Sequence, residues 1–196
     1  MNERDTKGII FQMLLAIGED PLREGLMDTP DRVVRMWKEI YKGYDINNKP
    51  KITTFNNGSD GIEYDEMIND TGHYYSQCEH HMVPFFGQYF FAYIPDSKGK
   101  LLGLSKVARI VDYYSSKLQV QERLTTEIIE CLWKELCKDT IYKPLGMALV
   151  MDGKHLCKCM RGVRNEGIMR TTVLKGVFKT DASARAEFLG WVNATK

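Results

Sequence analysis

Two clusters of cysteine and histidine, far apart in the sequence, most constrain how this chain can fold. The first is Cys78-Glu79-His80-His81, which places a thiol and two imidazoles within four residues. Cys78 and His81 form a C-x-x-H pair, a spacing that lets one turn present both side chains to a single zinc ion. The second cluster runs from residue 155 to residue 159. If both clusters bind one metal, the fold must bring these two segments together.

The second cluster lies in a segment that we expect to be a strand. Residues 147–151 and 154–160 are predicted to be two strands, joined through Asp152-Gly153, a dipeptide typical of hairpin turns. Side chains alternate along a strand with period two, so His155, Cys157 and Cys159 would share one face.

Three of these side chains would make an open metal site. Cys78, His81 and Cys157 supply two sulfurs and a nitrogen, which leaves the fourth tetrahedral position of zinc for water, as in catalytic zinc centres. His80 and His155 would then be free to move protons beside that water.

Other interpretations of the two clusters stay open on spacing alone. Cys159 could be a fourth ligand, which would close the site and make the zinc structural. A disulfide between Cys78 and Cys157 is a further alternative, disfavoured in a reducing cell. Spacing also leaves open whether His80 or His81 binds the metal.

A cluster of cationic side chains is predicted at the start of a helix. The segment Gly103-Leu-Ser105-Lys106-Val-Ala-Arg109 offers a hydroxyl, an amine and a guanidinium where free backbone N–H groups already favour an anion. The alternative is an ordinary solvated first turn. Arg161 and Arg32 could add further positive charge.

Glu122, within Gln121-Glu122-Arg123, is a candidate for base recognition. A carboxylate can accept two parallel N–H donors, and guanine offers such a pair through N1–H and its 2-amino group. The alternative is a helix glutamate held in a salt bridge.

Composition and periodicity predict an α+β protein of 196 residues. Hydrophobic residues make up 43% and charged residues 27%, no apolar run approaches the ~20 residues of a membrane span, and the first residues are polar, so we expect a cytoplasmic protein. The net charge of +1 argues against a broad nucleic-acid-binding face. Helical spacing predicts helices at 9–17, 29–41, 105–114, 124–136 and 184–192. Runs of β-prone residues predict strands at 85–94 and 171–178, in addition to the expected hairpin. Residues 44–62 are expected to form a loop.

Several blocks in order resemble GTP cyclohydrolase I. They are Asp28-Thr-Pro-Asp-Arg-Val33, Cys78-Glu-His-His-Met-Val-Pro-Phe85, Gly103-Leu-Ser-Lys106, Leu118-Gln-Val-Gln-Glu-Arg-Leu-Thr125, His155-Leu-Cys157 with Met160-Arg-Gly162, and Arg185-Ala-Glu-Phe-Leu189. The resemblance implies a tunnelling fold, in which antiparallel sheets of several subunits close into a barrel, and a homodecamer with active sites at subunit contacts. We accordingly divide the chain into an N-terminal helical arm, 1–45, and a tunnelling-fold catalytic domain, 46–196, with an antiparallel sheet and two packed helices.

The resemblance also implies roles for single residues. Cys78, His81 and Cys157 would bind Zn²⁺, and His80 and His155 would serve acid–base steps. The triphosphate of GTP would be held by Ser105, which is also a catalytic candidate, and by Lys106, Arg109, Arg161 and Arg32. Gln121 and Glu122 fall where the family binds guanine.

The implied reaction opens the imidazole ring of GTP at C8, releases formate and forms 7,8-dihydroneopterin triphosphate. Two rival interpretations are a related tunnelling-fold enzyme acting on pterins or deazaguanines, and a non-catalytic GTP-binding scaffold with a structural zinc.

Overall fold

The computed structural model describes residues 2–195, and its centre is a five-stranded sheet in the order β5-β2-β3-β6-β7. Neighbouring strands are antiparallel, except that β5 runs parallel to the end of β2. A separate two-stranded sheet pairs β1 with β4. The strands are β1 (Thr54–Asn56), β2 (Ile68–Cys78), β3 (Pro84–Ile94), β4 (Lys100–Leu102), β5 (Leu118–Gln119), β6 (Gly146–His155) and β7 (Met169–Gly176).

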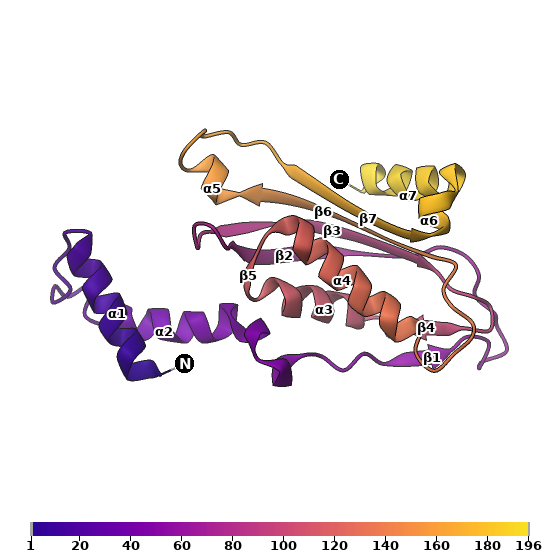
Figure 1. The fold of residues 1–196 in the computed structure, drawn as a ribbon, viewed down its shortest axis with the longest axis horizontal. Helices are drawn as coiled ribbons and strands as arrows, with labels where there is room; N and C mark the ends of the chain where they lie inside the picture. The colour runs from indigo at the N-terminus through magenta and orange to yellow at the C-terminus, as the bar shows by residue number, and fades with distance from the viewer. Residues whose placement is uncertain (1, 196) are drawn as a thin grey trace.

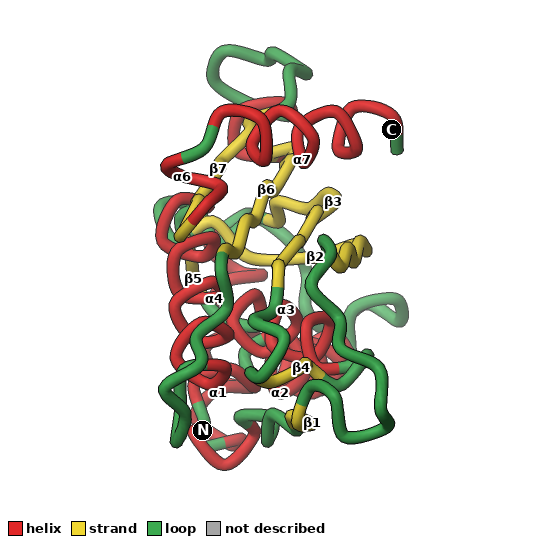
Figure 2. The backbone as a smooth tube through the Cα atoms, turned by 90° about the vertical axis from the view of Figure 1, so that its right-hand side faces the viewer, coloured by secondary structure: helices red, strands yellow, loops and turns green. Residues whose placement is uncertain are grey.

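Helices cover both faces of the sheet, as Figures 1 and 2 show. On one face lie α3 (Lys106–Ser115) and α4 (Gln121–Leu136), and on the other lie α6 (Val177–Thr180) and α7 (Ala182–Ala194). The remaining helices are α1 (Glu3–Ala16), α2 (Thr29–Ile40), the 3-10 helices η1 (Lys42–Tyr44) and η2 (Ile46–Asn48), and the short α5 (Leu156–Cys159). The α+β class predicted from the sequence is confirmed; closure of several sheets into a barrel stays a prediction.

The main core lies between the sheet and the pair α3–α4. Apolar residues recur along α4 every four positions, at Leu124, Ile128, Leu132 and Leu136, and each of them is fully buried. Strand β3 is aromatic along most of its length because its alternate side chains enter two cores. Phe85, for example, faces α3 and α4, whereas other β3 side chains pack against α6 and α7.

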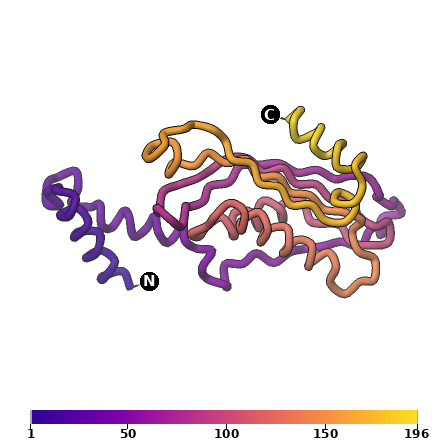
Figure 3. Tube along the Cα trace, turned by 45° about the horizontal axis from the view of Figure 1, so that its top comes forward, coloured from indigo at the N-terminus to yellow at the C-terminus, as the bar shows by residue number. Residues whose placement is uncertain are grey.

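The N-terminal helices α1 and α2 lie beyond one end of the sheet (Figures 1 and 3). Helix α2 begins at Thr29 and has Pro30 in its first turn, as the sequence indicates. The division of the chain into arm and domain at residue 45 stays a prediction. None of the helices between residues 2 and 195 is long and apolar enough to cross a membrane.

The expected hairpin at Asp152-Gly153 is wrong. Both residues lie inside β6, which pairs with β3 along its length and with β7 from Gly146 to Gly153. The second predicted strand ends at His155, and residues 156–159 are helix α5. Alternation along a strand therefore does not apply to Cys157 and Cys159.

Four strands were not predicted, namely β1, β2, β4 and β5. Residues 68–78 form β2, which has polar residues and a glycine and little alternation to signal a strand. The loop expected at 44–62 contains the short strand β1, the 3-10 helix η2 and the last residue of η1.

Candidate metal centre and active site

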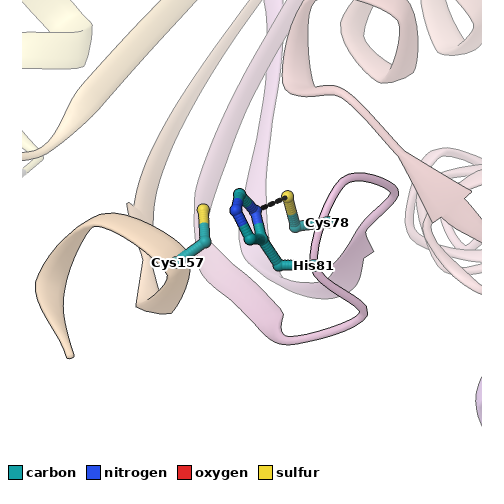
Figure 4. A group of neighbouring side chains, drawn as sticks. All are labelled: Cys78, His81 and Cys157. Atoms are coloured by element: carbon teal, nitrogen blue, oxygen red, sulfur yellow. Dashed lines mark hydrogen bonds between the residues drawn. The ribbon is translucent and has the colours of Figure 1, made fainter. Parts of the chain in front are cut away.

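Cys78, His81 and Cys157 come together at one end of the sheet (Figure 4). One donor atom from each lies within 4.8 Å of the other two, and Cys78 Sγ lies 3.7 Å from His81 Nδ1. Zinc binds sulfur at about 2.3 Å and nitrogen at about 2.0–2.1 Å, which puts such a pair about 3.5 Å apart around a tetrahedral ion. The donor set therefore fits a metal of this kind.

A closed turn between β2 and β3 presents Cys78 and His81. The Cys78 carbonyl accepts from the N–H groups of His81 and Met82, at 3.3 and 2.8 Å, and the Cys78 N–H donates to Val83. Met82 has a left-handed φ of 54° that turns the chain back into β3. The C-x-x-H spacing thus acts as predicted, through one turn.

The first turn of α4 supports this metal-binding turn. Arg123 pairs with the Glu79 carboxylate, and the Glu79 N–H donates to the Gln119 carbonyl at 3.1 Å. The hydrogen bond from Arg123 lowers the pKa of Glu79. These contacts connect the Gln-Glu-Arg block to the Cys-Glu-His-His block, although the sequence gives no sign that the two blocks touch.

Cys157 reaches the cluster from helix α5, whereas Cys159 does not join it. Residues two apart on a helix point about 200° apart, so the two thiols lie on different sides of α5. Within residues 2–195 the group of potential ligands contains Cys78, His81 and Cys157 and omits Cys159. Cys159 is therefore not placed to be the fourth ligand of a closed, structural zinc site. Burial and the Cys78 thiol raise the pKa of Cys157, which disfavours its thiolate unless a cation lies nearby.

His80 and His155 lie beside the cluster in different surroundings. The His80 side chain is mostly exposed, and its Nε2 is 3.9 Å from a Glu79 carboxylate oxygen. His155 is half-buried at the end of β6, and its ring stacks on Phe85 with centroids 4.5 Å apart and planes 3° apart. Burial lowers the pKa of His155, while the carboxylate of Glu122 acts in the opposite direction.

The side-chain amide of Gln121 already makes hydrogen bonds within the protein. The residue is 1% exposed, and its side chain contacts β6, β7 and His155. The expectation that Gln121 holds guanine is therefore not supported by its contacts. Glu122, one residue further, is exposed at the same end of the sheet and is free to meet a ligand.

Arg161 lies against the metal cluster. Its Nη1 is 3.0 Å from His81 Nε2, a contact in which the guanidinium donates and the imidazole accepts. A metal on Nδ1 requires the ring proton to be on Nε2, which then cannot accept from Arg161. The two contacts exclude each other, so metal binding would release Arg161.

Three of the predicted phosphate residues, Ser105, Lys106 and Arg109, lie at the opposite end of the sheet. Helix α3 begins beside the first residues of β2, since Gly103 and Leu104 line one small cavity together with Ile68 and Asp70. Cys78 is the last residue of β2, ten residues further on, which corresponds to roughly 30 Å of extended strand. Figure 1 shows the same separation between β4, which leads into α3, and α5.

The residues on this segment are open to solvent. Ser105 and Arg109 are exposed, Lys106 is half-buried, and the Ser105 hydroxyl makes no capping hydrogen bond. Leu104 is 92% exposed. Arg32, on α2, is exposed and pairs with Asp28 at 3.2 Å. A single chain therefore does not bring Ser105, Lys106 and Arg109 to the metal cluster.

The family model and the curated relatives agree on one family. A family model described as GTP cyclohydrolase I matches residues 6–193. A protein named GTP cyclohydrolase 1 from Caldanaerobacter subterraneus subsp. tengcongensis is 44% identical, with 100% of both chains covered. Its namesake from Helicobacter pylori (strain G27) is 43% identical, covering 88% of this chain and 91% of its own. Among solved structures, the apo form of the archaeosine synthase QueF-Like matches with a TM-score of 0.44 and 14% identity, over 56% of this chain and 93% of its own.

Proposed function

The chain belongs to the GTP cyclohydrolase I family, and from this premise we propose that it hydrolyses GTP. The imidazole ring of the purine is opened at C8, that carbon leaves as formate, and the product is 7,8-dihydroneopterin triphosphate, the first intermediate of a pterin- or folate-type biosynthesis. The observation that carries this proposal is the meeting of Cys78, His81 and Cys157 beside His155.

We propose that the cluster binds Zn²⁺. Two sulfurs and an imidazole nitrogen at these separations suit zinc, and three protein ligands leave one position open. Zinc bound there would supply Lewis-acid activation of a water molecule for attack on C8. The five cysteines are free thiols, which suits a reducing compartment such as the cytoplasm.

Two histidines are proposed to move the protons of the reaction. His155 is held in one orientation against Phe85, so it suits the protonation of a purine ring nitrogen as the imidazole ring opens. His80 is exposed on the metal-binding turn and can exchange protons with water. Glu122, near His155, would accept the N1–H and 2-amino groups of guanine.

The triphosphate is proposed to be bound by a second copy of the chain. The start of α3 lies roughly 30 Å from the metal cluster of its own chain, farther than one nucleotide triphosphate reaches. A neighbour's Ser105, Lys106 and Arg109 can reach the site if the chains assemble head to tail in a ring. The exposed Leu104 next to these residues is suited to such a contact. We therefore propose a homo-oligomer, with a decamer as the family precedent, and an additional phosphate contact from Arg161 once the metal releases it.

The first experiment incubates the protein with GTP. Formate is assayed directly, and after oxidation the product is detected by neopterin fluorescence. Tight GTP binding without formate would favour the non-catalytic scaffold and contradict the proposal.

Two variants distinguish binding of the triphosphate from binding of the guanine base. Lys106→Ala should weaken GTP much more than guanosine, because the lost contact is to the phosphates. Glu122→Gln should weaken both, since it replaces a double acceptor by an amide that also donates. Equal weakening of GTP and guanosine by Lys106→Ala would contradict the phosphate assignment.

A further inference from the structure

The side chain of Gln121 is fixed in one orientation by the strands beneath it. Its Nε2 lies 2.8 Å from the Met151 carbonyl, 3.1 Å from the Met169 carbonyl and 3.1 Å from Thr171 Oγ1. Carbonyl oxygens only accept hydrogen bonds, so the atom that faces Met151 and Met169 must be the amide nitrogen. The amide oxygen Oε1 therefore points the other way.

That oxygen contacts the ring of His155. Gln121 Oε1 lies 2.8 Å from His155 Nε2, and an amide oxygen can only accept. His155 Nε2 must then carry a hydrogen. In the neutral ring this leaves the lone pair on Nδ1, since a neutral imidazole has one N–H and one acceptor nitrogen. The stack on Phe85 fixes the plane of the same ring, so both its tilt and its proton position are set.

A glycine in β6 makes room for this arrangement. A Cβ on Gly153 would overlap Gln121 Oε1 and lie 2.6 Å from the Tyr74 hydroxyl oxygen. Both positions are buried, so neither group can move into solvent. The Asp-Gly pair that resembles a hairpin turn thus serves a close approach inside a continuous strand.

We propose that Gln121 is a positioning residue for His155, and not a contact to the guanine base. It holds the His155 ring in one orientation with its hydrogen on Nε2, and so leaves the Nδ1 lone pair facing away from the glutamine. The catalytic part of this proposal rests on the proposed function, in which His155 transfers protons. The position of the ring hydrogen does not, because it follows from contacts within the chain.

The test reads the ring hydrogen directly. Solid-state nitrogen NMR of the zinc-loaded protein, labelled only in its four histidines, distinguishes Nε2–H from Nδ1–H whatever the size of the assembly. The His155 signals are assigned by difference from His155→Ala, at a pH where imidazoles are neutral. We expect Nε2–H in the unaltered protein, and Nδ1–H there would overturn the proposal without any variant.

Two variants test the cause. Gln121→Met removes the acceptor and should give a mixture of both forms. Gln119→Met is the matched control, because Gln119 is also a fully buried, hydrogen-bonded glutamine but contacts Tyr114, Glu127 and Arg123 instead. It should leave the His155 signals unchanged, and a shift as large as that of Gln121→Met would overturn the proposal.

Steady-state kinetics on the same proteins separate positioning from base recognition. Gln121→Met should lower kcat by about 10- to 100-fold with little change in KM, as for loss of a group that orients a catalytic histidine. Gly153→Ala, which keeps the glutamine but displaces it, should act in the same direction. A raised KM with unchanged kcat would assign Gln121 to the base and overturn the proposal. An unaltered protein that shows Nε2–H but releases no formate would refute the proposed function alone.

Discussion

The separation between the metal cluster and the start of α3 predicts that two inactive chains can restore each other. One chain carries Lys106→Ala and the other His155→Ala, so each keeps one intact half of the site. Because the two residues lie roughly 30 Å apart within a chain, we expect a working site to take His155 from one copy and Lys106 from its neighbour.

The expected recovery follows from counting. In randomly mixed oligomers with equal amounts of both chains, half of the sites have an intact His155 and half of those meet an intact Lys106. About a quarter of the unaltered activity should therefore return, if each site draws on two copies in a closed ring. If one chain supplied both residues, every site would contain one defect and no activity would return.

The assay measures formate release by mixed oligomers purified through two different affinity tags. Each variant alone is the control and should be nearly inactive. Doubly tagged oligomers without recovery would refute the two-chain site, as would a fully active monomer. The same design with Arg32→Ala and His80→Ala asks whether the arm residue also comes from another copy.

Three other changes test the metal, the core and one half-buried carboxylate. Cys157→Ala should lose zinc and activity together while Cys159→Ala keeps both, measured as metal per chain, and zinc loss in Cys159→Ala would mean that the site is closed. Leu132→Ala should lower the free energy of unfolding by about 2–5 kcal/mol in urea denaturation, since the side chain is fully buried under the sheet, and a loss well below this range would contradict the packing. Burial raises the pKa of Asp70 in the folded protein. The contribution of Asp70 to the free energy of unfolding is therefore fully present below the pKa of Asp70 in the unfolded chain, and it is lost as the pH rises through the pKa in the folded protein. Asp70→Asn should remove this loss, which thermal unfolding between about pH 3 and pH 7 will show, and an unchanged pH profile would contradict it.

The sequence singled out Cys78, His81 and Cys157, which the structure brings together, but it did not predict the elements around them. The pair Cys78 and His81 lies in a single turn, so its spacing carries the geometry with it. Cys157 was placed on a strand because Asp152-Gly153 has the composition of a hairpin turn. Local composition cannot show that Gly153 is needed for the approach of a glutamine 32 residues earlier in the chain.

Positions that depend on contacts between distant segments could not be predicted from the sequence. The resemblance to the family places Gln121 at the guanine, but its amide is held by carbonyl groups of β6 and β7. The Ser105 segment was expected to bind phosphate, and nothing in its spacing reveals that it lies at the far end of the sheet. Strand β2 has an alternating burial pattern only near its end, where Tyr74, Ser76 and Cys78 turn inward.

The order in which the cluster is completed has a consequence for folding. Cys78 and His81 belong to a tight turn between adjacent strands, a local pairing of the kind that forms early. Cys157 joins only after β6 has docked on β3 across a long intervening segment. A metal that needs all three ligands can therefore bind only the finished sheet. Interactions absent from the folding transition state mainly slow unfolding. A bound ion would then slow unfolding and prolong the lifetime of the folded chain, without speeding its folding.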